Sequence, residues 1–188
     1  LSVLFTAALA VAHRGSVLGH LPAEPQPTQK TFESGIWQTL RHFDPAHVIF
    51  VESESKKVGN LRVPDVLMEK MRASLCISLG LSRTMRVQLL MQDYEHFIAH
   101  PEILNTQLDC LIPLHGKEKI ARWQAMALSG DMKTLVDELL ANHYDPAYLR
   151  SIDRNFAQVT QAMQLELADI SQAAFDAAAE SLHPALQI

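Results

Sequence analysis

The feature that most constrains the fold is an apolar run followed at once by charged and turn residues, VIFVESESKKVGNLRVP, over residues 48–64. Its first four residues, Val48–Val51, are β-branched or aromatic without a polar break, which is typical of a strand covered on both faces. Gly59 and Asn60 then predict a turn. Because ligands of an open parallel sheet bind just beyond the carboxyl ends of its strands, Glu52 stands where a metal or a polar substrate would bind.

The segments around this run alternate between helical and strand-like patterns. Thr28 can cap a helix whose apolar residues recur at helical spacing, and Pro64 is typical of the first turn of a second helix. Residues 75–79, LCISL, predict a second strand. This αβαβ order predicts an α/β fold with a parallel sheet and covering helices. The stripe of the first helix, which we expect in the core, is Phe32, Ile36, Trp37, Leu40 and Phe43.

The first twelve residues, LSVLFTAALAVA, form an apolar segment with two interpretations. Ala10-Val11-Ala12 would suit a signal-peptidase site, but neither an initiating Met nor a basic stretch precedes it. The segment is also shorter than the roughly 20 apolar residues that span a bilayer. We therefore expect a buried element of a domain, in a chain that is a fragment of a longer protein.

Beyond Ser82 the strand patterns end, and apolar spacing predicts helices alone. HYDPAYLRSIDRNF, residues 143–156, interrupts them and concentrates aromatic and basic side chains. Residues 157–182 contain Asp and Glu but neither Lys nor Arg, which predicts an acidic terminal helix. The regions expected from these patterns are an α/β region over 1–81, a helical region packed on it over 82–156, and the terminal helix over 157–188.

The charge balance excludes binding through a broad basic face. The chain has 21 acidic and 16 basic residues, and the four acidic ones after residue 155 leave 17 against 16 before it. A local patch would still suffice for a few phosphate contacts. The basic residues expected in such a patch are Arg14, Lys30, Lys56, Lys57, Arg62, Arg150 and Arg154.

The cysteines and histidines show no ligand spacing. Cys76 and Cys110 are far apart and outside any CxxC pair, so we expect reduced, buried thiols in a cytoplasmic protein. The nine histidines form no HExxH, which argues against a dedicated zinc site. With 48% hydrophobic and 20% charged residues, the chain is long and apolar enough for one domain with a real core.

Several long strings, in the same order, resemble the carboxyl-terminal region of the tRNA 2-selenouridine synthases, a bacterial family of tRNA-modifying enzymes. They cover most of residues 13–156, whereas the first twelve residues and the tail match poorly. The strings are HRGSVLG from His13, PQPTQKTFES from Pro25, FVESESKKVGN from Phe50 with the LRVP after it, and HYDPAYLRSIDRNF from His143.

The resemblance implies a P-loop NTPase-like fold, joined in the family to an amino-terminal rhodanese-like domain with a catalytic cysteine. Family members act on 2-thiouridine at the tRNA wobble position. Geranyl diphosphate supplies a geranyl group to the sulfur, and selenophosphate supplies the selenium that replaces it. The implied partners are therefore tRNA and the rhodanese-like domain, with Mg²⁺ as a candidate ion and neither a membrane nor DNA as a partner.

The sequence departs from this pattern in two ways, since it contains neither a rhodanese-like domain nor a GxxxxGK[ST] phosphate loop. Residues 1–81 would then be a partial P-loop-like region without its loop. Cys76 and Cys110 lie outside the domain that carries the family nucleophile, so no catalytic residue is assignable. The alternatives are a portion of the synthase, a truncated non-catalytic remnant of it, or, less favoured, a P-loop small-molecule kinase relative.

Glu52 resembles the acidic residue that ends a conserved strand of P-loop proteins and holds Mg²⁺ beside a diphosphate, with Glu54 as a weaker candidate. The alternative is a strand-end carboxylate paired with Lys56 or Lys57. Tyr144 could stack on an unpaired anticodon base, or could pack the last helix on the core, which is the interpretation favoured for Tyr148. The candidates to hold substrate or tRNA are Arg14, Gly15, Ser16, Lys30, Ser53, Ser55, Lys56, Lys57, Asn60, Arg62, Tyr144, Arg150 and Arg154.

Overall fold

The computed structural model describes residues 2–9, 26–53 and 56–185, and the chain divides into two compact units. The first unit consists of Leu1–Ile77, Ile152–Met163 and Ala179–Ile188. The second consists of Ser78–Ser151 and Gln164–Ala178.

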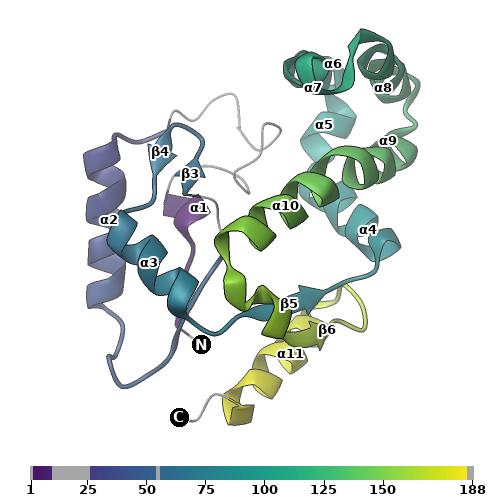
Figure 1. Ribbon diagram of the computed structural model, residues 1–188. Coiled ribbons are helices and arrows are strands. Elements are labelled where there is room, and N and C mark those ends of the chain that lie inside the picture. The colour runs from purple at the N-terminus through teal and green to yellow at the C-terminus, as the bar shows by residue number, and fades with distance from the viewer. Residues whose placement is uncertain (1, 10–25, 54–55, 186–188) are drawn as a thin grey trace. The chain divides into compact units, whose positions relative to one another are not determined.

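The first unit contains the short strands on either side of the charged stretch, with helices between them. Its elements are β1 (Ser2–Leu4), α1 (Thr6–Leu9), α2 (Gln29–Arg41), β2 (Ile49–Val51), β3 (Lys57–Val58), β4 (Leu61–Arg62), α3 (Asp65–Ala73) and the 3-10 turn η3 (Ala157–Gln161), labelled in part in Figure 1.

Strands β1 and β2 form a two-stranded parallel sheet in which Leu4 lies opposite Val51. The prediction of parallel strands is confirmed for this pair, one strand of which comes from the apolar start of the chain. The expectation that the strand near residues 75–79 joins the same sheet is wrong, because β5 (Ile77–Gly80) pairs with β6 (Met163–Glu166). Leu4 is completely buried, as expected of a core element. The strand after Asp44 is less covered than predicted: Val48 is 47% exposed and precedes β2, whose own residues are half-buried.

The two helices of this unit begin where the sequence predicts. Thr28 caps α2, because its Oγ1 accepts a hydrogen bond from the Thr31 backbone N–H at 3.2 Å. Pro64 directly precedes α3, whose first turn carries Asp65 at the positive end of the helix dipole.

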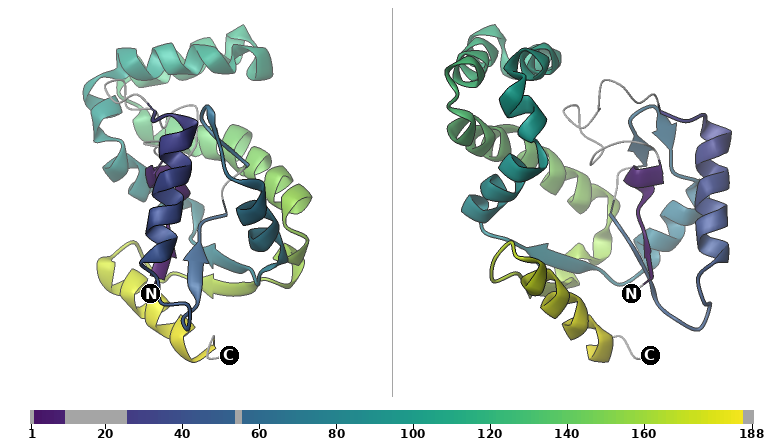
Figure 2. Two further views of the ribbon diagram at one scale, coloured as in Figure 1. Left: turned by 90° about the vertical axis from the view of Figure 1, so that its left-hand side faces the viewer. Right: turned by 180° about the vertical axis from the view of Figure 1, so that it is seen from behind.

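Helix α2 buries one stripe against β1, beside which it runs in both views of Figure 2. Phe32 and Ile36 are buried, as predicted. The expectation that Trp37 belongs to the core is wrong, since its side chain is 58% exposed. It follows Ile36 by one residue and so points about 100° further around the helix. There the Arg41 guanidinium lies over its ring, 4.6 Å from the centroid.

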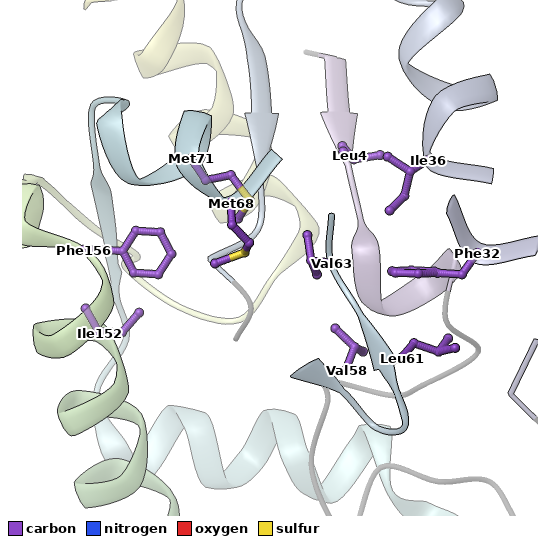
Figure 3. Packing of buried hydrophobic residues seen from close by; sticks show 10 residues of the cluster. All are labelled: Leu4, Phe32, Ile36, Val58, Leu61, Val63, Met68, Met71, Ile152 and Phe156. Carbon is purple, nitrogen blue, oxygen red and sulfur yellow. The ribbon is translucent and has the colours of Figure 1, made fainter. Parts of the chain in front are cut away.

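The core of the first unit joins segments far apart in the sequence. Ile152 and Phe156 lie on the α3 side of the cluster, next to Met68 and Met71 (Figure 3). The end of the HYDPAYLRSIDRNF string is therefore a packing element of this unit. The other buried members are Leu4, Phe32, Ile36, Val58, Leu61 and Val63.

The second unit is mostly helical, as predicted for residues 82–156. Its elements are α4 (Arg83–Asp93), α5 (Glu95–Ala99), α6 (Pro101–Leu108), the 3-10 turn η1 (Asp109–Leu111), α7 (Ile112–His115), α8 (Lys117–Ser129), α9 (Met132–Leu139) and the π-helical turn η2 (Leu140–Tyr144). Four elements have residues in both units: β5 (Ile77–Gly80), α10 (Asp145–Asn155), β6 (Met163–Glu166) and α11 (Gln172–Ala185).

Two helix pairs, α4 with α9 and α6 with α8, make up the body of this unit. Trp123 on α8 is completely buried, and its indole N–H donates to Glu138 at 2.8 Å. Arg86 on α4 binds Asp145 at the start of α10 with two hydrogen bonds of 2.7 and 2.8 Å. Such a bidentate pair fixes both the distance and the orientation of the two helices.

The expected helix over residues 157–182 is wrong in its first half, where β6 pairs with β5. Leu167 N–H donates to the Gly80 carbonyl at 2.9 Å, and Met163 N–H to the Cys76 carbonyl at 3.0 Å. The residues of β6, MQLE, alternate apolar and polar side chains, and pairing with β5 satisfies their backbone groups. Only α11 is helical in this region, apart from the short turn η3.

The expectation of buried cysteines is also wrong, although both thiols are free. Cys76 is half-buried just before β5, and Cys110 is exposed in the turn η1, where Leu111 takes the buried position. Among the residues that the structure describes, no helix is both long and apolar enough to cross a membrane.

We predict that Arg86→Ala lowers the free energy of unfolding by about 1.5–3 kcal/mol, because Asp145 loses two charge-assisted hydrogen bonds in a partly buried site. Arg83→Ala is the matched control. Arg83 binds Asp137 through one contact of 2.8 Å at a more exposed position, so its loss should cost less than about 1 kcal/mol. Urea unfolding followed by circular dichroism measures both, and equal losses would contradict the assigned role of the Arg86 pair.

Candidate functional site

The charged stretch leaves the parallel sheet at the carboxyl end of both strands. Because Leu4 pairs with Val51, Thr6 and Glu52 follow their strands at the same edge. Glu52 is half-buried directly after β2. Thr6 is completely buried, and its hydroxyl forms no hydrogen bond within the described part of the chain. This edge therefore carries a carboxylate and an orphaned hydroxyl, both of which are oxygen ligands for a polar group.

Two glutamine side chains hold the hairpin β3–β4 that follows this edge. Gln26 Nε2 donates to the Val58 carbonyl at 3.1 Å, and its Oε1 accepts from the Asn60 N–H at 2.8 Å. Gln29 binds Arg62 in the same way, donating to its carbonyl at 2.8 Å and accepting from its N–H at 2.9 Å. Each amide thus serves as a partner for backbone groups that a further strand would otherwise satisfy.

The predicted turn at Gly59 and Asn60 is confirmed, and its geometry favours glycine. Gly59 has φ of 61°, in the left-handed region that side chains disfavour. A Cβ on Gly59 would also clash with the end of the Gln26 side chain, which would have to move. Backbone conformation and the glutamine contact therefore both disfavour other residues here.

Lys56 forms an ion pair with Asp65, a partner that was not predicted from the sequence. Its Nζ lies 2.7 Å from Asp65 Oδ1, in the first turn of α3. This hydrogen bond, with the charges of Lys56, Arg62 and Arg72, holds the pKa of the Asp65 carboxyl below its usual value. Lys56 therefore ties the hairpin to α3.

Three further candidate cations lie in the hairpin and at the start of α2. Lys57 on β3, Arg62 on β4 and Lys30 in the first turn of α2 are all exposed, as is Asn60 in the turn. The bonds from Gln29 to Arg62 join the start of α2 to the hairpin, so these residues come from adjoining elements. Ser53 is half-buried after Glu52. The following predicted candidates lie outside the described residues: Arg14, Gly15, Ser16, Glu54 and Ser55.

The candidates near residue 150 belong to α10 and the turn before it. Tyr144 is half-buried at the end of η2, with its ring 4.8 Å from that of His143. Arg150 and Arg154 are exposed and four residues apart on α10, hence on one side of that helix. The expectation that Tyr148 packs on the core is wrong, because it is 57% exposed and Ile152 and Phe156 provide the buried anchors.

The edge after β1 and β2 offers at most part of a magnesium site. Across residues 2–9, 26–53 and 56–185, no three His, Cys, Asp or Glu side chains converge as a metal cage would require. Mg²⁺, however, takes one or two carboxylates and completes its shell with water and substrate phosphates. Glu52, with the orphaned Thr6 hydroxyl at the same edge, would be the residue to supply such a carboxylate.

Residues 8–107, more than half of the chain, match the family model of the tRNA 2-selenouridine synthase AAA domain. The chain belongs to this family. The match confirms the resemblance drawn from the HRGSVLG, PQPTQKTFES and FVESESKKVGN strings, and it confirms the P-loop-like α/β fold class. It ends before the helical elements from η1 onward.

Curated relatives of this chain carry the family's name. The tRNA 2-selenouridine synthase of Cupriavidus pinatubonensis is 28% identical over 175 residues, which cover 78% of this chain and 48% of the relative. That of Cupriavidus necator is 28% identical, with coverages of 78% and 47%. That of Shewanella halifaxensis is 26% identical over 181 residues. The chain thus spans about half the length of the curated relatives it matches. No solved structure matches it.

Sequence reasoning missed the structural role of Gln26 and Gln29. Both stand in the PQPTQK string, on either side of the predicted cap Thr28. The signal available in the sequence was two glutamines three residues apart around a helix cap. Their targets, more than 30 residues away, could not be identified from it.

We predict that Gly59→Ala destabilises the chain by about 1–3 kcal/mol more than Gly130→Ala. Both glycines have positive φ, but an added Cβ at Gly130 meets nothing within 4 Å. The control therefore measures backbone strain without the clash. Urea unfolding of both variants measures the difference.

A double variant separates the two contributions further. In a Gln26→Ala background the extra loss at Gly59 should shrink, because the clashing amide is gone. An unchanged loss in that background would refute the glutamine contact as its cause.

Proposed function

We propose that this chain is the tRNA- and diphosphate-binding part of a tRNA 2-selenouridine synthase. The family match over residues 8–107 is the observation that carries this proposal. The complete enzyme would geranylate 2-thiouridine at the wobble position with geranyl diphosphate, and would then replace sulfur by selenium from selenophosphate. The rhodanese-like cysteine and the phosphate loop would belong to the half of the relatives that this chain does not span, and the enzyme would act in the cytoplasm.

The edge after β1 and β2 supports the diphosphate role. Glu52 and the buried Thr6 hydroxyl would hold Mg²⁺ and its waters, with Glu54 next along the chain. When bound, the ion would neutralise charge on the diphosphate leaving group. By family resemblance, Ser53, Ser55 and the HRGS residues Arg14, Gly15 and Ser16 are further candidates to bind the substrate. The region over residues 1–81 would then act as the partial P-loop-like part of the enzyme.

The clamped hairpin supports contact with the tRNA backbone. Lys57, Arg62 and Lys30 expose cations on a scaffold fixed by Gln26 and Gln29. Asn60 adds an amide at the turn. Exposed cations held on a rigid scaffold bind phosphates with little loss of side-chain or loop entropy.

The helical region would contribute to recognition of the unpaired anticodon. Tyr144 would stack on a base, and Arg150 and Arg154 would bind phosphates beside it, since single-stranded loops are recognised by stacking and charge. Residues 82–156 would thus form a tRNA-facing module, and the acidic tail over 157–188 would have no part in RNA contact.

We predict that Glu52→Gln lowers geranyl transfer by at least about 100-fold, because a neutral amide cannot organise the ion beside the diphosphate. The assay fuses this chain to the amino-terminal half of the Cupriavidus pinatubonensis relative and measures wobble nucleosides by mass spectrometry. Glu69→Gln, an exposed carboxylate on α3, is the matched control.

Full geranyl transfer by the Glu52→Gln variant would contradict the proposed role of Glu52 in holding the ion beside the diphosphate. A folded fusion that binds tRNA but yields neither geranylthiouridine nor selenouridine would refute the transferase assignment for this chain.

We predict that Lys57→Gln and Arg62→Gln each reduce the slope of log affinity against log salt by about 0.7–0.9, as expected for one lost phosphate contact. The probe is an anticodon stem-loop containing 2-thiouridine, followed by fluorescence anisotropy between low and physiological salt. Lys56→Gln should change the slope less, because Lys56 is bound to Asp65. Identical slopes for all three variants would argue against the hairpin as a phosphate-binding surface.

A further inference from the structure

The second unit contains a pair of imidazoles in direct contact, which the proposed function does not use. His115 ends α7 and His143 lies in η2, and His115 Nε2 is 3.1 Å from His143 Nδ1. One ring donates this hydrogen bond and the other accepts it. Each ring keeps its second nitrogen for another partner, so a single added proton leaves both outer nitrogens as donors.

Aromatic residues and a glycine hold this pair in place. The His115 ring packs edge-on against the buried Trp123 at 5.1 Å, and the His143 ring packs against Tyr144. Gly116, with φ of 79°, ends α7 and lets α8 begin at the next residue. This sharp connection places His115 against Trp123, which lies about two turns into α8.

Two further cations surround the pair. Lys119 lies over the Trp123 ring, 5.1 Å from its centroid, and donates to Asn142 Oδ1 at 3.0 Å, next to His143. Arg150 on α10 is exposed and lies close enough to act on His143. We name the four residues His115, Lys119, His143 and Arg150 the imidazole cluster.

The carboxylates of the packed elements are already occupied. Glu138 on α9 accepts from Trp123 and from Arg122, and Asp145 on α10 accepts two bonds from Arg86. Lys117 and Glu118, at the start of α8, are both exposed. The charges from outside the pair that act on the two imidazoles are those of Lys119 and Arg150.

The titration behaviour agrees with this charge. Burial, followed by the charge of Lys119, lowers the pKa of His115 below its usual value of 6.5. Burial, followed by the charges of His115 and Arg150, lowers the pKa of His143. The charges of Lys119 and Arg150, which act in addition to burial, favour an anion beside the pair. A bound anion would raise both pKa values.

We propose that the imidazole cluster binds a phosphodiester group of the tRNA and takes up a proton as it does so. The assignment to RNA rests on the proposed function, whereas the anion site itself rests on the arrangement of the four side chains. A tetrahedral phosphate would accept hydrogen bonds from the imidazole pair, the Lys119 ammonium and the Arg150 guanidinium. Tyr144, adjoining the pair, would then lie beside the bound backbone, where a neighbouring base can stack.

The first test measures the histidine pKa values of the 188-residue chain by NMR, with and without inorganic phosphate. We expect phosphate to raise the pKa of His115 and His143 and to leave that of the exposed His47 unchanged. This measurement needs no variant, so it does not depend on a substituted chain folding. Absence of any phosphate-induced shift on the pair would overturn the anion site.

The second test measures binding of the anticodon stem-loop by anisotropy between pH 5.5 and 8. The imidazole pair should have a higher pKa in the RNA complex than in the free chain. Affinity for the stem-loop should therefore rise as pH falls between these two pKa values, by up to about tenfold per pH unit, and level off below the lower one. His143→Gln should remove this rise, whereas His100→Gln, at an exposed position, should keep it. Lys119→Gln should weaken binding across the whole pH range with the imidazoles intact.

The outcomes distinguish this inference from the proposed function. Tight binding whose pH dependence survives His143→Gln would overturn the imidazole cluster and leave the tRNA role standing. A phosphate-induced pKa rise without stem-loop binding would support the anion site and contradict the tRNA role. Zn²⁺ that binds the wild-type chain and displaces phosphate from the pair would show a metal site and overturn the proposal.

Discussion

Backbone hydrogen bonding in very small sheets is the constraint on which the rest of this structure depends. The three sheets of the described chain have two strands each. An isolated pair of strands is marginally stable in water, so each pair needs packing or further hydrogen-bond partners to persist. Gln26 and Gln29 supply those partners for the hairpin β3–β4. Phe32 and Ile36 of α2 supply the packing for β1.

The candidate diphosphate edge is a consequence of the same arrangement. Parallel pairing of β1 with β2 brings two carboxyl-terminal ends together, and so delivers Thr6 and Glu52 to one edge. The hairpin that follows is then fixed from three directions, by the two glutamines and by the Lys56–Asp65 pair. The candidate edge is thus supported by contacts whose partners lie far apart in the sequence.

The second unit uses burial and charge in a different way. Asp137 and Asp145 are matched by Arg83 and Arg86, while the His115–His143 pair lies near Lys119 and Arg150. Burial and these two cations both favour the neutral imidazoles. This arrangement is the basis of the phosphodiester contact proposed above.

Local patterns in the sequence determined a large part of this protein. The β-branched run before Glu52, the cap at Thr28, the turn at Gly59 and the family strings each depend on neighbours within a few residues, and each was predictable for that reason. Tertiary structure alone decided the outward direction of Trp37, the strand β6 in place of a helix, the exposure of Tyr148 and the approach of His115 to His143. These depend on partners tens of residues away, and neither helical periodicity nor composition contains the information that brings such partners together.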